Sequence, residues 1–214
     1  YYPNLISKIL KTVKKLKDEL NIHMDYISLG GGYGIPYTDE DSPLNFDNVF
    51  NNVAQNFNVF FESRHEAKPA LWIEPGKSVV GDTGILLTRV TGKKDSYKSY
   101  IGVDAGMETL MRPALYGAYH RIYKVGDPDA LPSTKVDITG RICENTDRLA
   151  KDRLFPEVNE GDLLAVMDAG AYGFTMSNQF CTRPKVAEIF LAGEKPTLIR
   201  RRETIKDILR SCDV

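Results

Sequence analysis

The sequence has 214 residues, of which 42% are hydrophobic and 27% are charged, and this composition is ordinary for a globular chain. Lys and Arg number 28 against 29 Asp and Glu, and the resulting net charge of −1 argues against nucleic-acid binding as the main function, because such proteins are usually basic. No apolar stretch reaches the roughly 18 residues needed to span a bilayer, and no secretory segment opens the sequence.

Helical and strand-like patterns alternate over the first 76 residues. In chain order they predict a helix over 5–20, a strand over 26–29, a helix over 46–64 and a strand over 70–73. Asn45 or Ser42 is the expected N-cap of the second helix. Short buried strands that alternate with helices predict parallel βαβ structure, and in barrels of this kind the functional residues lie at the carboxyl ends of the strands.

The pattern changes after about residue 80. Turn residues there separate strand-like segments at 81–90, 97–103, 135–140, 163–168 and 187–191, and a short helix is expected near 202–209. The predicted fold class is therefore α/β plus β: residues 1–84 could supply the last part of a (β/α)8 barrel, and residues 85–214 would form a mostly antiparallel β-sandwich or barrel. Two βα units cannot close a barrel, which needs eight strands.

Two motifs stand at the ends of the first two strands. Glycines from Gly30 to Gly34 offer bare N–H groups to a phosphate, although a purely structural glycine turn is at least as compatible with the pattern. Glu74-Pro75-Gly76-Lys77 places a carboxylate and an ammonium after the second strand. The carboxylate could hold a protonated ring nitrogen, and the alternative is a surface turn with an ion pair.

Further candidates lie in the second half. Arg112 and Tyr116 share a loop and could bind a carboxylate, because a guanidinium matches it with two parallel hydrogen bonds; the alternative is a structural salt bridge. Cys143 beside Glu144 could donate a proton, although a lone cysteine is usually a small buried hydrophobe. Tyr172 stands in a loop of small residues from which its phenol could project. The alternative is a packed tyrosine whose hydroxyl finds a backbone partner.

The remaining cysteines and the histidines suggest no site. The three cysteines are widely spaced, which fits neither a zinc site nor a disulfide framework and predicts a reducing, cytoplasmic compartment. The three histidines lie too far apart in sequence to suggest a metal site, and we assign them no role.

Taken together, the motifs resemble the diaminopimelate decarboxylase family, pyridoxal-phosphate enzymes of the alanine-racemase-like and ornithine-decarboxylase-like fold class. Order and spacing match from about residue 25 to the end. The matching segments are 30–34, Glu74-Pro75-Gly76-Lys77, Asp104-Ala105-Gly106-Met107, 112–120, Cys143-Glu144-Asn145-Thr146-Asp147, Ala150-Lys151-Asp152-Arg153, Asp168-Ala169-Gly170-Ala171-Tyr172-Gly173 and Arg200-Arg201-Arg202-Glu203-Thr204.

The resemblance implies decarboxylation of meso-2,6-diaminopimelate to L-lysine and CO2, with pyridoxal 5′-phosphate as cofactor, in a homodimer whose active sites lie at the subunit interface. It implies that the cofactor is bound by Gly32, Glu74, Gly76, Lys77 and Tyr172. It implies that the substrate is bound by Lys77, Arg112, Tyr116, Glu144 and Tyr172. Cys143 would be the catalytic proton donor, contributed by the partner subunit.

Two departures qualify the resemblance. The family usually has Arg at the position of Lys77, and lysine cannot make the planar two-pronged contact with a carboxylate. No lysine of this sequence matches the family's Schiff-base motif, so we expect a C-terminal portion of the enzyme. The alternatives are a related decarboxylase of carboxynorspermidine, ornithine or a carrier-bound amino acid, and a non-catalytic homologue. Glu144 favours diaminopimelate, because the ornithine enzymes carry Asp after the cysteine.

Overall fold

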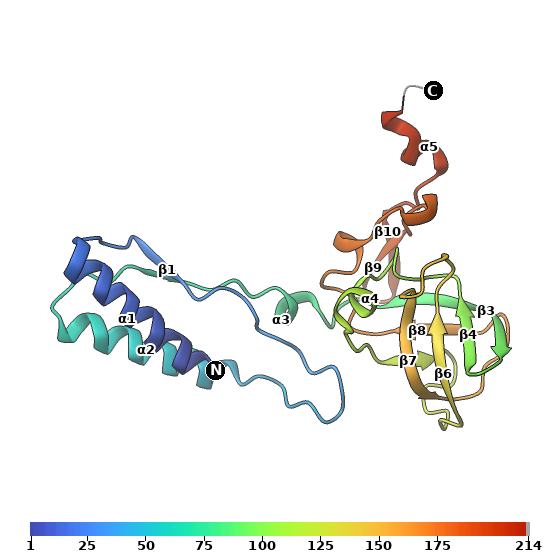
Figure 1. Cartoon of the computed structure of the whole chain (residues 1–214), viewed down its shortest axis with the longest axis horizontal. Helices are drawn as coiled ribbons and strands as arrows, with labels where there is room; N and C mark the ends of the chain where they lie inside the picture. Colours follow the sequence, from blue (N-terminus) through green and yellow to red (C-terminus); the bar gives the residue numbers. More distant parts are fainter. Residues whose placement is uncertain (213–214) are drawn as a thin grey trace. The chain divides into compact units, whose positions relative to one another are not determined.

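The computed structural model describes residues 1–212, and the chain divides into two compact units (Figure 1). Unit 1 comprises residues 1–36 and 40–79, and unit 2 comprises residues 37–39 together with 80 onward. The boundary after residue 84 that the sequence suggests stays a prediction. No helix in the described part of the chain combines the length and the apolar character that crossing a bilayer requires.

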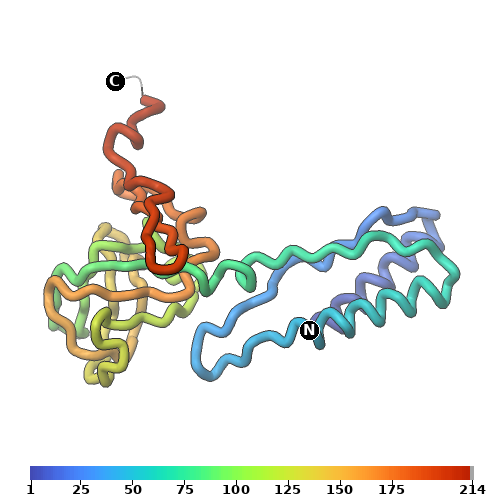
Figure 2. Tube along the Cα trace, turned by 180° about the vertical axis from the view of Figure 1, so that it is seen from behind, coloured from blue at the N-terminus to red at the C-terminus, as the bar shows by residue number. Residues whose placement is uncertain are grey.

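Unit 1 is a pair of βα repeats. It contains α1 (Tyr2–Leu20), β1 (Tyr26–Ser28), α2 (Phe46–Ser63) and β2 (Ala70–Trp72), and α3 (Lys77–Val80) spans the end of unit 1 and the start of unit 2. The strands β1 and β2 pair in parallel, with Ile27 opposite Leu71, as the sequence pattern predicts. The helices α1 and α2 lie side by side when the unit is seen from either side (Figures 1 and 2).

The apolar faces of α1 and α2 make the core of unit 1. Val53, Phe57 and Phe61 recur every four residues and are buried, and they pack in one cluster with Ile6 of α1 and Ile27 of β1. Burial of a side chain of this size contributes roughly 1.5–3 kcal/mol. The cluster therefore fixes both strands against the helices.

The N-terminus of α2 is capped as expected. The Oδ1 atom of Asn45 accepts a hydrogen bond from the backbone N–H of Asn48 at 2.9 Å. Such a cap satisfies one of the free N–H groups of the first turn.

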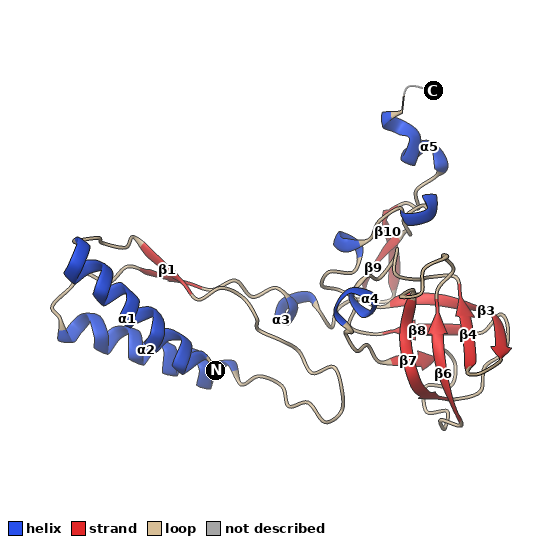
Figure 3. Ribbon diagram, in the orientation of Figure 1, coloured by secondary structure: helices blue, strands red, loops and turns tan. Residues whose placement is uncertain are grey.

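Unit 2 is built on a curled six-stranded sheet in the order β5-β8-β3-β4-β6-β7 (Figure 3). Its strands are β3 (Leu86–Asp95), β4 (Ser99–Val103), β5 (Ile122–Lys124), β6 (Thr134–Thr139), β7 (Arg148–Phe155) and β8 (Leu163–Val166). All neighbouring pairs are antiparallel except β4 and β6, which are parallel. The mostly antiparallel domain predicted from the sequence is thus confirmed. Its core contains Val90, Val103, Ile138, Leu149, Leu164 and Val166.

Smaller elements complete unit 2. They are α4 (Arg112–Tyr116), the 3-10 turns η1 (Phe174–Met176), η2 (Phe180–Thr182) and η3 (Leu209–Ser211), the antiparallel hairpin β9 (Glu188–Ala192) and β10 (Lys195–Arg200), and α5 (Ile205–Ile208).

Several predicted boundaries were wrong. The strand predicted to begin at residue 81 begins at Leu86, because Gly84 packs directly against Gly170 and residues 81–83 form a turn. The helix predicted over 202–209 is the single turn of α5, followed by η3. Strands β5, β7 and β10 were not predicted at all.

Candidate active site

In unit 1 the glycine run and Glu74 lie next to each other, at the carboxyl ends of the paired strands. The backbone N–H of Glu74 donates to the carbonyl oxygen of Gly30 at 3.0 Å. A Cβ atom on Gly31 would lie 2.8 Å from the carbonyl oxygen of Glu74, so only glycine permits this approach. Gly32 has a φ of +89° and open space where a side chain would stand. Its backbone is therefore available to a ligand.

A short hydrogen-bond chain orients the Glu74 carboxylate. The hydroxyl of Ser28 donates to Oε1 of Glu74 at 2.6 Å, and the backbone N–H of Gly30 donates to the same hydroxyl oxygen at 3.0 Å. Among residues 1–212 no cation forms an ion pair with Glu74, so the surface ion pair considered as the alternative is not formed. The carbonyl oxygen of Gly76 accepts a hydrogen bond from the backbone N–H of Val79. Lys77 is the first residue of α3.

In unit 2 the guanidinium of Arg112 is buried beside His120. Arg112 is 7% exposed; its Nη1 lies 3.0 Å from Nε2 of His120, and its guanidinium carbon lies 5.0 Å from the centre of the Tyr37 ring. Arginine only donates hydrogen bonds, so Nε2 of His120 must accept. The Nδ1–H of His120 then donates to the carbonyl oxygen of Met167 at 2.8 Å. Burial, and to a smaller extent the charge of Arg112, lowers the pKa of His120.

The segment that carries Arg112 is a helical turn, not the loop that the sequence suggested. Pro113 stands in its first turn, and Gly117 ends it with a φ of +63°. Tyr116 lies one turn after Arg112 and is 65% exposed. No salt bridge joins Arg112 to a carboxylate of the described residues, so its charge is not used in a structural pair.

The loop that carries Cys143 is built around a buried carboxylate. Asp147 is 3% exposed, and its side chain accepts from the backbone N–H of Met107 at 2.7 Å and from that of Ile142 at 3.0 Å. A Cβ atom on Gly140 would lie 2.2 Å from the Asp147 carboxylate. Asp147 therefore ties the loop after β4 to the loop after β6, and it fixes the backbone that precedes Cys143.

Glu144 is held by its neighbour in the same loop. Its Oε1 accepts from the backbone N–H of Thr146 at 3.1 Å and from the hydroxyl of Thr146 at 3.0 Å. These bonds lower the pKa of Glu144, so the carboxylate is ionised at neutral pH. An ionised carboxylate is suited to an ammonium group.

Cys143 is exposed, so it is not the small buried hydrophobe that was the alternative. Its Sγ lies 3.8 Å from the Sγ of Cys181. The two thiols are 38 residues apart in sequence, and the spacing alone had indicated no cysteine pair.

Tyr172 projects from a tightly packed loop after β8. Asp168 is buried and forms an ion pair with Arg121 at 3.1 Å. A Cβ atom on Gly170 would lie 1.8 Å from the carbonyl oxygen of Val80. Beyond this fixed stretch Tyr172 has a φ of +60° and is 47% exposed. It is thus not a packed core tyrosine.

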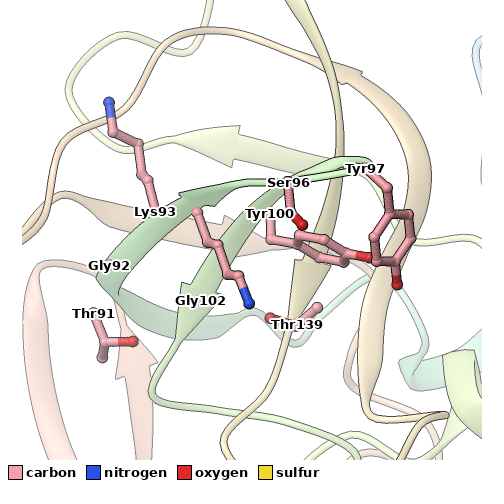
Figure 4. A pocket seen from close by; sticks show the side chains of 9 residues that line it. Thr91, Gly92, Lys93, Ser96, Tyr97, Tyr100, Gly102 and Thr139 are labelled. Carbon is pink, nitrogen blue, oxygen red and sulfur yellow. The ribbon is translucent and has the colours of Figure 1, made fainter.

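Two cavities open on unit 2. One, of about 400 Å³, is lined by residues of α4 and of the Cys143 loop, among them Pro113, Gly117, Asn145 and Thr146. The other, of about 460 Å³, lies beside the β3–β4 hairpin and is lined by Lys93, Tyr97 and Tyr100 among others; none of the predicted site residues lines it (Figure 4). None of the predicted site residues lines the smaller cavity either, but its lining includes Pro113, which follows Arg112 in the chain, and Asn145, which follows Glu144.

The chain is similar to known proteins in sequence and in fold. Residues 16–170 match the family model described as the C-terminal sheet domain of pyridoxal-dependent decarboxylases. The chain belongs to the pyridoxal-dependent decarboxylase family. The match covers residues of both units, from α1 to the loop before Tyr172.

Relatives in this family carry a more specific name. The chain is 41% identical to diaminopimelate decarboxylase from Methanothermobacter thermautotrophicus over 98% of its own length and 49% of that protein. It is 42% identical to the enzyme of the same name from Archaeoglobus fulgidus over 90% of its length and 45% of that protein. The chain thus spans about half the length of the curated relatives that it matches.

A solved structure supports the fold. The crystal structure of diaminopimelate decarboxylase from M. jannaschii in co-complex with L-lysine matches the whole chain and 48% of that protein, with a TM-score of 0.85 and 32% identity. The likeness confirms the predicted fold class, the last part of a (β/α)8 barrel followed by a β domain.

Sequence reasoning missed two residues of the candidate site, His120 and Asp147, and one residue that lies beside the site, Cys181. His120 received no role, although it stands at the end of the 112–120 motif. Asp147 was seen as part of a motif, but its two backbone donors were not predictable. Cys181 carried no signal in the sequence, because only the fold brings it to Cys143.

Proposed function

We propose that the protein to which this chain belongs decarboxylates meso-2,6-diaminopimelate to L-lysine and CO2, the last step of lysine biosynthesis. The observation that carries the proposal is the 41% identity, over 98% of the chain, to a protein named for this activity. The L-lysine in the related crystal structure is the product of the same reaction.

The end of the β1–β2 pair fits pyridoxal 5′-phosphate. Gly32 has an unobstructed backbone for the phosphate, and Gly76 and Lys77 follow on the next strand's loop. Glu74, already oriented by Ser28, would face the pyridine nitrogen and keep it protonated. Tyr172, exposed on its loop, would lie beside the cofactor and the substrate. When bound, the cofactor supplies an electron sink for the charge left by the departing carboxylate.

Unit 2 supplies groups for the substrate. Arg112 has a guanidinium that no carboxylate of the described residues occupies, and His120 and Tyr37 orient it. With Tyr116 and Lys77 it would bind the substrate carboxylates. Glu144, kept ionised by Thr146, would bind the distal ammonium.

Cys143 would return a proton to the carbon that has lost CO2. Its exposure gives it access to a substrate, and the Asp147 hydrogen bonds fix the backbone next to it. A cysteine thiol acts as a general acid when its pKa lies close to the working pH. We further propose a cytoplasmic homodimer with shared active sites, in which Cys143 serves the partner's site.

The test is CO2 release by the full-length protein supplied with pyridoxal phosphate. Release from meso-diaminopimelate, and much slower release from ornithine and carboxynorspermidine, is the expected result. Cys143→Ser should lower kcat at least 100-fold, on the scale of general acid catalysis. Cys212→Ser is the matched control and should keep the wild-type rate. Turnover of ornithine alone would contradict the proposed substrate, and no turnover of any of the three would favour a non-catalytic homologue.

A further inference from the structure

The contact between two thiols, one of them that of Cys143, has no part in the function proposed so far. Cys143 and Cys181 are both exposed, and their sulfur atoms lie 3.8 Å apart, at van der Waals contact. A disulfide joins sulfur atoms at about 2.05 Å, so the two sulfur atoms must approach each other further for the bond to form. The third cysteine, Cys212, is exposed and is not in contact with either of them among the described residues.

The turn that carries Cys181 is held in an unusual backbone conformation. Cys181 and Thr182 have φ values of +55° and +56°, in the left-handed region that side chains other than glycine disfavour. Strain of this kind persists only where the surroundings impose it, and it gathers at functional positions.

Contacts on both sides of this turn impose the conformation. The backbone N–H of Asn178 donates to the carbonyl oxygen of Glu108, which anchors the turn to the body of unit 2. Glu203 accepts from the side chain of Gln179 on one side and from the backbone of Lys185 on the other. The Cys181 thiol therefore lies next to Cys143 on a segment that hydrogen bonds hold on both sides.

The segment that precedes Cys143 is also held by hydrogen bonds. The Asp147 carboxylate accepts from the N–H of Ile142, the residue before Cys143. Arg141, one residue further back, donates to the buried carboxylate of Glu108 at 3.0 Å. Glu108 therefore contacts both thiol segments, through its carboxylate on one side and its backbone carbonyl on the other. Both partners of the pair are held by the same residue.

From this geometry we propose that Cys143 and Cys181 form a dithiol site that peroxides oxidise reversibly to an intrachain disulfide. One thiolate of the pair attacks a peroxide oxygen; the O–O bond breaks, water leaves, and the sulfur becomes a sulfenic acid. The second thiol attacks that sulfur; the S–O bond breaks, a second water leaves, and the S–S bond forms. The two thiols lose two electrons and two protons, and one hydrogen peroxide is reduced to two molecules of water.

The consequence for activity rests on the proposed function. A Cys143 locked in a disulfide has no proton to donate, so oxidation would stop decarboxylation until a reductant restores the thiol. Cys181 would also protect Cys143, because a sulfenic acid captured as a disulfide is not oxidised further to the irreversible sulfinic acid. The site is thus a redox switch placed on the proton donor.

Partial desolvation and the contact with Cys143 raise the pKa of the Cys181 thiol. Because the thiolate is the reactive form, disulfide formation should become faster as the pH rises above neutrality.

The first experiment follows the thiols themselves and needs no catalysis. The chain is treated with hydrogen peroxide, blocked with N-ethylmaleimide under denaturing conditions and weighed by intact mass spectrometry. We expect one blocked thiol instead of three, and a non-reduced tryptic digest that links fragment 142–148 to the fragment with Cys181. Cys212→Ser should still form the link, and Cys181→Ser should instead accumulate sulfinic acid at Cys143. Three blocked thiols after peroxide, or links made through Cys212, would overturn the inference.

The second experiment measures CO2 release by the full-length enzyme. Peroxide should abolish the activity of the wild-type enzyme, and dithiothreitol should restore it. Cys181→Ser should have the wild-type rate before peroxide treatment, and dithiothreitol should not restore that rate afterwards. Absence of the disulfide in an active enzyme overturns this inference and leaves the proposed function standing. A disulfide that leaves the rate unchanged overturns the switch and also contradicts the role of Cys143 as proton donor.

Discussion

The Nε2 atom of His120 accepts a hydrogen bond from Nη1 of Arg112 at 3.0 Å, inside unit 2. This contact fixes the protonation state of the histidine, because a doubly protonated ring has no acceptor to offer. The neutral ring, whose Nδ1–H is held by the carbonyl of Met167, is therefore part of what positions the guanidinium. A histidine without catalytic duty thereby makes the Arg112 site sensitive to acid.

The first prediction concerns stability against pH. The pKa of His120 in the folded chain lies below its ordinary 6.5, so as the pH falls below about 6.5 the unfolded chain takes up this proton first. This contribution to the free energy of unfolding should be fully present above pH 6.5 and should be lost progressively as the pH falls below about 6.5.

Urea unfolding at several pH values measures this effect. Circular dichroism is the suitable signal, because the single tryptophan, Trp72, lies in unit 1. His120→Gln, which keeps one acceptor and one donor but does not titrate, should flatten the decrease. An equal decrease in the variant would show that another group is responsible.

The second prediction concerns Arg112 in the full-length enzyme. Arg112→Lys keeps the charge but loses the planar pair of donors. Charge-assisted hydrogen bonds contribute about 1.5–3 kcal/mol, so KM for diaminopimelate should rise roughly 10- to 100-fold. Arg210→Lys, at an exposed position, is the matched control. Steady-state kinetics that show an unchanged KM would remove Arg112 from the substrate site.

Local patterns in the sequence were enough to predict α1, β1, α2 and β2, but not α3. Amphipathic spacing placed α1 and α2, and of the two cap residues considered for α2, Asn45 and Ser42, the structure shows Asn45 as the cap. β7 was missed because Arg148–Phe155 has four charged residues among its eight and does not alternate regularly between buried and exposed positions. β7 is an edge strand that pairs with β6, and no local sequence pattern encodes this pairing.

In the candidate site, too, some features follow from local sequence and others only from tertiary packing. Positions such as Glu74 and Gly32 were predictable, because the carboxyl ends of neighbouring parallel strands meet at one edge. The contact of Arg112 with His120 and that of Cys143 with Cys181 join residues whose relation is set by tertiary packing. Residue type and spacing therefore suggested the candidate groups, but not the contacts that hold them.

The third prediction concerns Asp147. Asp147→Asn leaves one acceptor oxygen, so one of the two backbone donors, Met107 or Ile142, would face an amide NH2 group instead. An unsatisfied buried donor costs about 1–3 kcal/mol, and the loop that carries Cys143 should loosen with it. We expect a lower urea midpoint and a lower kcat in the full-length enzyme. Asp129→Asn, on the exposed surface, should change neither. Full stability and full kcat in Asp147→Asn would contradict the positioning role.

The last prediction concerns the close packing under the Tyr172 loop. A methyl group on Gly170 would lie 1.8 Å from the carbonyl oxygen of Val80, which is backbone and cannot rotate away. Overpacking of this kind costs about 1–3 kcal/mol, so Gly170→Ala should lower the free energy of unfolding by at least that amount and displace Tyr172. Gly92→Ala is the matched control, because a methyl group there meets nothing within 4 Å. Equal urea midpoints for the two variants would show that the backbone under Tyr172 can shift without cost. In that case the loop could not be the rigid support that a cofactor-contacting tyrosine requires.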